Sequence, residues 1–468
     1  MARLAERVLF AAAAALVLFG CGSGESPAAR PNIVLVYVDD MGWRDMAVQG
    51  SDYYLTPHMD QLASEGVRFR QAYSNAPNCA PSRASLLSGR YGPRHGVYTV
   101  GSSERGASRN RALIPVKNRT VLDTSFVTLA EGLSAAGYTN GFFGKWHLGA
   151  EGFGPTDQGF DRAEGWSEAG SPPGYYWPYQ RGRLSLPGLA EEGRAGEHLT
   201  DRLVDEALDF MHQTEGPFFV MLSHYAVHTP IQADSSRVGR FRDRRPVGGH
   251  QSDAYASMIA GVDDGLGRIR DALVEMGVAH NTYIVLASDN GGFGPITDML
   301  PLRGAKGMLY EGGVRVPMIV TGPGVKPRLD DTPVIGMDLY PTFLEWAGYS
   351  KPAWTDGLSL ARLISAGEPV VERSLFWHFP AYLEATGDME ELWRTTPASS
   401  IRRGSHKLLR FYETGTTELY DLSAEPGEQT LLQDPDVQRL LEGELAAWLS
   451  ATDAFIPTQA NPDYVPAR

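Results

Sequence analysis

Cysteine and positive charge are both scarce in this sequence. The 468 residues include two cysteines, and 42 Lys and Arg stand against 56 Asp and Glu, which gives a net charge of −14. An acidic balance of this size argues against a nucleic-acid-binding protein, which would carry a basic patch or stripe. A few cations that converge locally can still bind an anion. With 43% hydrophobic and 21% charged residues and no internal repeat, the composition indicates a globular protein rather than a disordered or fibrous one.

The apolar run near the N-terminus is shorter than a typical membrane-spanning helix. Two arginines precede this run over residues 8–19, and the pattern predicts a secretory signal over residues 1–20. The run leads into residues 18–21, Leu-Phe-Gly-Cys, which is similar to a bacterial lipobox. We therefore expect Cys21 to be lipidated and to become the mature N-terminus, with residues 21–30 as a flexible tether. Ordinary cleavage to a soluble product is the alternative.

The lipobox also predicts where the protein works. It implies an exported protein, periplasmic or at the cell surface, that is anchored through lipid to a bacterial membrane. Gly22 rather than Asp follows the cysteine, which in many Gram-negative bacteria allows passage to the outer membrane. With Cys21 lipidated and Cys79 in the motif described below, neither cysteine is left for a disulfide.

Alternating strand and helix patterns dominate the chain from residue 31 to about residue 345. Continuous apolar runs predict strands that are buried on both faces of a parallel sheet, at residues 33–38, 218–222 and 283–287. Helical periodicity covers residues 199–211 and 255–274. This alternation predicts an α/β sandwich, in which ligands bind beyond the carboxyl ends of the strands.

The pattern changes after about residue 345. Short strands are expected at residues 374–379, 407–412 and 418–422, followed by an amphipathic helix over residues 436–449. We therefore predict a catalytic domain over residues 31–345 and a C-terminal subdomain over residues 346–468. The subdomain would be a small antiparallel sheet with a helix packed on it.

Two pairs of oxygen-bearing side chains follow predicted strands. Asp39 and Asp40 follow one strand, and Asp289 and Asn290 follow another. Acidic pairs in loops are usually solvated turns, but placement at two strand ends favours a metal site. No Cys or His accompanies them at zinc spacing, so Ca²⁺, or else Mg²⁺, fits better than zinc.

The run Cys79-Ala80-Pro81-Ser82-Arg83, which continues to Arg90, is the most informative segment of the chain. A lone loop cysteine is more often inert. This run, however, resembles the signature of the formylglycine-dependent sulfatases, Cys-x-Pro-x-Arg. The resemblance implies that a formylglycine-generating enzyme reads Pro81 and Arg83 in the extended chain and oxidises Cys79 to formylglycine, an aldehyde.

Three further segments resemble sulfatase motifs in the same order. Residues 137–149 carry Lys145 and His147, with Asn140 where relatives more often have Thr. Residues 224–230 carry His228, with Val227 where relatives usually have Pro. Residues 303–307 carry Lys306. The resemblance spans residue 31 to about residue 429 and implies an alkaline-phosphatase-like sandwich with a large, mostly parallel sheet.

The resemblance also implies roles for these residues. Ca²⁺ would be held by the two oxygen-bearing pairs and by residue 79, whose hydrated aldehyde attacks sulfur. Arg83 would orient that hydroxyl, and Lys145 and Lys306 would hold the sulfate oxygens. His228, a further substrate contact, or Lys306 would protonate the leaving oxygen, and His147 would deprotonate the second hydroxyl.

The expected substrate is a sulfated carbohydrate or an aryl sulfate. His378, in the aromatic segment over residues 376–382, is a candidate contact to a substrate hydroxyl. His224 is interpreted as a loop histidine with satisfied hydrogen bonds. Two rival hypotheses remain, a formylglycine-dependent phosphonate monoester hydrolase or phosphodiesterase and a non-catalytic glycan-binding lipoprotein. A zinc alkaline phosphatase fits less well, because it would require a Ser or Thr nucleophile and more His and Asp ligands.

Overall fold

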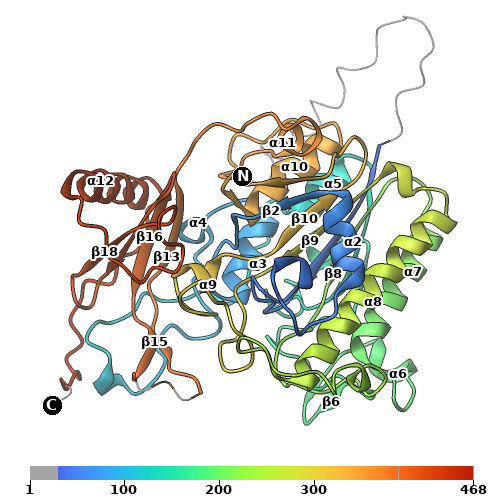
Figure 1. The fold of residues 1–468 in the computed structure, drawn as a ribbon, viewed down its shortest axis with the longest axis horizontal. Coiled ribbons are helices and arrows are strands. Elements are labelled where there is room, and N and C mark those ends of the chain that lie inside the picture. The colour runs from blue at the N-terminus through green and yellow to red at the C-terminus, as the bar shows by residue number, and fades with distance from the viewer. Residues whose placement is uncertain (1–29, 388, 390, 467–468) are drawn as a thin grey trace, which may run out of the picture.

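A large, mostly parallel sheet forms the centre of the molecule, as the alternating pattern predicts (Figure 1). The computed structural model describes residues 30–387, 389 and 391–466. Eight strands lie in the order β11-β2-β10-β9-β1-β8-β4-β5, and β10 is the one strand among them that runs against its neighbours. In chain order they are β1 (Asn32–Val38), β2 (Val67–Phe69), β4 (Thr139–Gly144), β5 (Arg162–Glu164), β8 (Phe218–Ser223), β9 (Thr282–Ser288), β10 (Met318–Thr321) and β11 (Arg328–Asp330).

Helices cover both faces of this sheet, which is why its central strands are apolar throughout. Side chains alternate between the two faces of a strand. In β1, Val34 and Val36 face one core and Ile33 and Leu35 face the other. The first core is closed by α2 (Pro57–Glu65), α7 (Leu199–Gln213) and α8 (Asp253–Glu275). The second is closed by α3 (Cys79–Ser88), α5 (Leu129–Ala135), α10 (Leu339–Trp346) and α11 (Ala361–Ala366).

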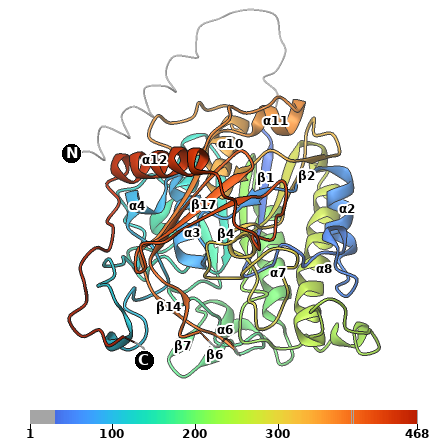
Figure 2. The ribbon, with the colours of Figure 1, turned by 60° about the vertical axis from the view of Figure 1, so that its left-hand side comes forward.

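A second, smaller sheet lies beside the large one (Figure 2). Its four strands are antiparallel and lie in the order β13 (Leu375–Phe379), β16 (Ala398–Arg403), β17 (His406–Phe411) and β18 (Thr417–Asp421). The closing helix α12 (Pro435–Ala451) packs on it through Leu441 and Leu445. Helix α11 still belongs to the core of the large sheet, so the small sheet begins at Leu375, well beyond residue 346.

The predicted N-terminal features lie outside the described residues. This applies to the signal peptide, to Cys21 and to the tether up to residue 29. Of the helices that the structure does describe, none combines the length and the apolar character needed to cross a bilayer.

A buried cluster of charges joins the small sheet to helix α9 (Glu311–Val314), which precedes β10 in the chain. Lys407 of β17 lies 2.9 Å from a carboxylate oxygen of Glu311, in α9, and 2.9 Å from one of Glu428. All three side chains are buried. Burial raises the pKa of Glu428 to about 7, and the ammonium of Lys407 opposes that rise. Lys407 is therefore the cation nearest to both buried carboxylates, and Arg315 lies 3.5 Å from the second oxygen of Glu311.

Replacing Lys407 with Met should lower the free energy of unfolding by about 3–5 kcal/mol, because two buried carboxylates lose the cation nearest to them. Urea unfolding followed by tryptophan fluorescence measures this change. Lys326→Met, at an exposed lysine, serves as the control and should alter stability by less than about 0.5 kcal/mol. A Lys407→Met protein as stable as this control would contradict the assignment.

Candidate active site

The predicted site residues gather at one edge of the large sheet. Strands β9, β1, β8 and β4 are parallel neighbours, so their carboxyl ends share that edge. Asp39 and Asp40 follow β1, Asp289 and Asn290 follow β9, and Lys145 follows β4. The sheet order thus brings together residues that are far apart in the sequence.

Four oxygen-bearing side chains form a compact, buried group at this edge. Asp39, Asp40, Asp289 and Asn290 are at most 2% exposed. Asn290 Nδ2 donates to Asp40 Oδ1 at 2.8 Å, and the Asp40 backbone N–H donates to Asp289 Oδ1 at 3.1 Å. Two oxygens, Asp39 Oδ1 and Asn290 Oδ1, are buried without a hydrogen-bond partner. Hard oxygen donors that lack partners in the interior fit a hard cation such as Ca²⁺.

Cations surround the carboxylates and set their protonation. Lys306 Nζ lies 2.6 Å from Asp40 Oδ1, and Lys145 Nζ lies 2.6 Å from Asp39 Oδ2. Burial alone would raise the pKa of Asp40, but Lys306 and His228 outweigh burial and lower it well below its ordinary value. Burial prevails at Asp39 and raises its pKa despite Lys145. Asp40 also has a φ of 61°, a conformation that non-glycine residues rarely adopt and that is often found at functional sites.

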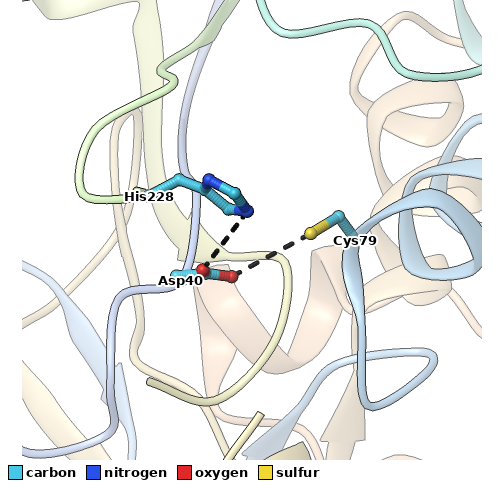
Figure 3. A group of neighbouring side chains, drawn as sticks. All are labelled: Asp40, Cys79 and His228. Atoms are coloured by element: carbon cyan, nitrogen blue, oxygen red, sulfur yellow. Dashed lines mark hydrogen bonds and ion pairs between the residues drawn. The ribbon is translucent and has the colours of Figure 1, made fainter. Parts of the chain in front are cut away.

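Cys79 is the first residue of α3 and faces Asp40 (Figure 3). Its Sγ lies 3.9 Å from Asp40 Oδ1, and the side chain is 1% exposed. Sγ also lies within 4.8 Å of one carboxylate oxygen each of Asp39 and Asp289, two of the predicted metal ligands. An oxygen-bearing derivative of residue 79 would complete the same ligand set. Because Pro81 and Arg83 are buried in the same helix, the folded chain cannot present the motif to a modifying enzyme.

Arg83, one helical turn after Cys79, fixes three segments of the site to one another. Its Nε and Nη2 lie 2.9 and 2.8 Å from Asp289 Oδ2. Its Nη1 donates to the Lys145 carbonyl at 2.9 Å and to Ser223 Oγ at 2.5 Å. Arg83 is thus a positioning residue in this structure, and its predicted bond to the group at residue 79 stays a prediction.

His147 reaches the site through a glycine-dependent turn after β4. Gly144 has a φ of 112°, and a Cβ there would lie 2.0 Å from the carbonyl oxygen of Ser223, so only glycine fits. His147 is 8% exposed, and its Nδ1 has no hydrogen-bond partner. Burial, assisted by the charges of Lys145 and Arg83, lowers the pKa of His147 well below its usual range. The ring is therefore neutral at pH 7 and can accept a proton.

His228 faces the site from the loop after β8. Its Nδ1 donates to the Thr229 carbonyl at 2.7 Å, which leaves Nε2 directed toward Asp40 Oδ2 at 3.7 Å (Figure 3). Burial and then Lys306 lower the pKa of His228. His224, by contrast, is buried, and neither of its ring nitrogens has a hydrogen-bond partner. The hydrogen bonds that we expected of His224 therefore find no partner among the residues that the structure describes.

Comparison with known proteins assigns the chain to a family. The sulfatase family model matches residues 31–349. The chain belongs to the sulfatase family. It is a sulfuric ester hydrolase, as the motifs predict. A second model, described as the C-terminal part of N-sulphoglucosamine sulphohydrolase, matches residues 305–452.

Individual relatives cover most of the sulfatase chain. A sulfatase of Formosa agariphila is 32% identical over 97% of this chain and 95% of its own. The N-acetylgalactosamine-6-sulfatase of Rattus norvegicus is 33% identical over 80% of this chain and 72% of its own. The crystal structure of Ps i-CgsB in complex with k-i-k-neocarrahexaose superimposes with a TM-score of 0.75 at 27% identity, covering 92% of this chain and 95% of that one.

The fold alone does not separate sulfatases from one rival class. The phosphonate monoester hydrolase of Agrobacterium radiobacter has the same fold, with a TM-score of 0.65 at 21% identity over 91% of this chain and 96% of that one. The choice between the two therefore depends on the family match and on chemistry.

A pocket of about 330 Å³ opens onto the site of this sulfatase. Cys79, His147, His228 and Lys306 all line it, whereas Lys145 is fully buried and does not. Two arginines of the pocket wall, Arg105 and Arg394, were missed by the sequence analysis. Each stands alone in an irregular or short extended segment without a motif, so the sequence carries no signal for them.

His378 lies away from this pocket. Its Nδ1 is 2.7 Å from Ser399 Oγ, and its Nε2 donates to the Phe455 carbonyl at 3.0 Å. Burial lowers the pKa of the ring to about 4, so the ring is neutral at pH 7. The neighbouring Trp377 and Phe379 belong to the core of the small sheet. The structure therefore gives no support to the predicted contact between His378 and a substrate hydroxyl.

Arg83→Lys should lower kcat by about 10²-fold, because lysine keeps the charge but cannot hold Asp289, Lys145 and Ser223 in one geometry. Since Arg83 positions other groups, KM should change much less than kcat. Steady-state kinetics on an aryl sulfate measures both constants. Arg181→Lys, at an exposed arginine outside the site, is the matched control. An Arg83→Lys enzyme with unchanged kcat would refute the positioning role.

Proposed function

We propose that this sulfatase removes sulfate from a sulfated carbohydrate through formylglycine at position 79, assisted by Ca²⁺. The observation that carries the proposal is the position of Cys79. It begins a helix, lines the pocket with Lys306 and two histidines, and lies beside the carboxylates of Asp39, Asp40 and Asp289. The carboxylates and the amide of Asn290 offer oxygen donors, which suit Ca²⁺ better than zinc, while Cys79 Sγ and His228 also lie beside Asp40.

Ca²⁺ would supply electrophilic assistance, and formylglycine would supply the nucleophile. Asp39, Asp40, Asp289 and Asn290, together with residue 79, would hold Ca²⁺, which when bound polarises sulfate oxygens. Formylglycine, when hydrated, offers one hydroxyl to attack sulfur and a second that permits release.

The remaining residues of the pocket would bind sulfate and move protons. Lys306 lines the pocket and would hold a sulfate oxygen. Lys145 is buried beside Asp39 and would add positive charge to the site without lining the pocket. A direct contact between Lys145 and sulfate stays a prediction. His147 is neutral and would take the proton from the second hydroxyl of residue 79. His228 Nε2 or Lys306 would give a proton to the leaving oxygen.

The names of similar proteins support a carbohydrate substrate. One relative is an N-acetylgalactosamine-6-sulfatase, and one similar structure contains a neocarrahexaose. The family match favours a sulfate ester over the phosphonate or phosphodiester alternative. The pocket residues Cys79, Lys306 and His228 also argue against a purely glycan-binding protein, which would not require them.

Active protein should carry formylglycine at position 79 and hydrolyse sulfate esters at least about 10²-fold faster than the matching phosphodiester. Peptide mass spectrometry of the segment around Cys79 checks the first expectation. Hydrolysis of 4-nitrophenyl sulfate, of bis(4-nitrophenyl) phosphate and of a set of sulfated sugars checks the second. Cys79→Ala should abolish turnover and leave the fold intact. A fully active enzyme with an unmodified thiol, or a preference for the phosphodiester, would overturn the proposal.

The purified protein should contain about one Ca²⁺ per chain, since the donor set is entirely oxygen. Asn290→Ala removes one donor without changing the charge and should weaken metal binding by about 10–100-fold or more, as loss of even an outer-shell partner does. Elemental analysis and calcium titration measure both effects, with Asp243→Asn, at an exposed carboxylate, as the control. Stoichiometric zinc on which activity depends would contradict the calcium assignment.

We further propose that the protein is exported and anchored through lipid at Cys21. The motif at residues 18–21 supports this proposal. Wild-type protein in its bacterial host should therefore sediment with membranes, and Cys21→Ser should release it to the soluble fraction. A wild-type protein that is wholly soluble, with a mature N-terminus beyond Cys21, would show that the lipobox was misread. The catalytic proposal would stand in either case.

A further inference from the structure

Two arginines from distant parts of the chain share the pocket that holds Cys79. Arg105 lies in the irregular segment between α4 (Gly92–His95) and α5, and Arg394 lies in β15 (Trp393–Thr395). Strand β15 pairs with β14 (Leu383–Glu384) to form a two-stranded ribbon of the C-terminal subdomain (Figures 1 and 2). The subdomain therefore supplies part of the pocket wall.

Among the residues that the structure describes, no carboxylate pairs with either guanidinium. Within residues 30–387, 389 and 391–466, Arg105 and Arg394 form no ion pair, and their side chains bond only to backbone. Arg105 Nη2 donates to the Val100 carbonyl at 2.9 Å, and Arg394 Nη1 donates to the Lys306 carbonyl at 3.2 Å. Arg394 Nε is buried without a partner. A guanidinium has five N–H donors, so most of them remain available to a ligand.

The backbone next to Lys306 makes room for Arg394. Gly307 has a φ of 90°, and a Cβ there would lie 3.0 Å from Arg394 Nε. Burial lowers the pKa of Arg394, the charge of Arg105 lowers it further, and Asp40 and Cys79 act in the opposite direction. The guanidinium is thus close enough to the reacting groups, and to Arg105, to interact with both electrostatically. Two guanidinium groups that line one pocket repel each other, and an anion bound between them would relieve that repulsion.

We propose that Arg105 and Arg394 form a second anion subsite, which selects sulfated carbohydrates carrying another anionic group besides the scissile sulfate. The inference rests on the proposed function, because it assumes that the scissile sulfate lies between Cys79 and Lys306. Sulfate and carboxylate both match the planar fork of arginine, which can bind either with two hydrogen bonds. The second group is therefore a sulfate or a uronate carboxylate, on the same ring or on the adjacent one.

Matched ligands separate these possibilities. The set comprises N-acetylgalactosamine 6-sulfate, its 4,6-disulfate, and the 6-sulfate linked to glucuronate. Isothermal calorimetry with the full-length Cys79→Ala protein should give at least about tenfold tighter binding of one dianionic ligand than of the monosulfate. The ligand that gains affinity identifies sulfate or carboxylate as the preferred second group. Equal affinity for all three ligands would overturn the proposal.

Arginine variants in the Cys79→Ala background test the two residues. Arg105→Gln, which leaves the contact to Lys306 untouched, and Arg394→Gln should each reduce the dianion-to-monoanion affinity ratio by about 10-fold, and the double variant by up to about 100-fold. Arg394→Lys should restore part of the ratio, because it keeps the charge but not the fork. Arg181→Gln should leave the ratio unchanged. Equal losses of affinity for mono- and dianionic ligands would show that the arginines are merely structural.

Kinetics separates this inference from the proposed function. In the wild-type enzyme, the second anion should act mainly on KM, and Arg105→Gln should raise KM for the dianionic substrate with a smaller change in kcat. If the wild-type enzyme hydrolyses sulfate esters without any preference for dianionic substrates, the subsite is refuted and the sulfatase activity stands. If it hydrolyses no sulfate ester at all, the proposed function fails, and the calorimetric ratio still decides the subsite.

Discussion

Three carboxylates withdrawn from water at one sheet edge are the constraint on which the active site depends. Asp39, Asp40 and Asp289 are buried, and removing such charges from water costs several kcal/mol each unless cations compensate. Lys145 pairs with Asp39, Lys306 with Asp40 and Arg83 with Asp289. These ion pairs form only when the large sheet, helix α3 and the loop after β9 are packed against one another.

The local cations explain how a protein with a negative net charge can bind an anionic substrate. The chain has a net charge of −14, yet the pocket wall carries Arg105, Lys306 and Arg394. Electrostatic interaction falls off within about 8 Å at physiological ionic strength for exposed charges, so a local group of cations governs the pocket while the distant acidic surface does not. The negative net charge is therefore compatible with a small anionic substrate.

The small sheet contributes more to the molecule than a packing surface. Lys407 of its strand β17 neutralises Glu311, which precedes the β10 segment of the large sheet, and the β14–β15 ribbon extends to the pocket. The ribbon brings Arg394 of β15 to the pocket that Cys79 also lines. The subdomain therefore supplies part of the pocket wall, while the carboxyl edge of the large sheet carries the carboxylates and Lys145.

The sequence by itself determined the family, the main strands and the core of the site. Continuous apolar runs such as residues 33–38 predicted the central strands because both faces of the sheet are covered, and the resemblance of the motifs to those of sulfatases predicted the residues that now gather around Cys79. Local patterns carry this information because strand ends and helix starts are encoded by neighbouring residues.

Only the tertiary structure decided which isolated polar residues belong to the site. His378 appeared in an aromatic segment and was expected to contact substrate, but both of its ring nitrogens bond within the small sheet and its surroundings. Arg105 and Arg394 carried no sequence signal, yet they line the pocket. Whether a single His or Arg faces a ligand depends on the packing of segments hundreds of residues apart along the chain, and no local pattern records that packing.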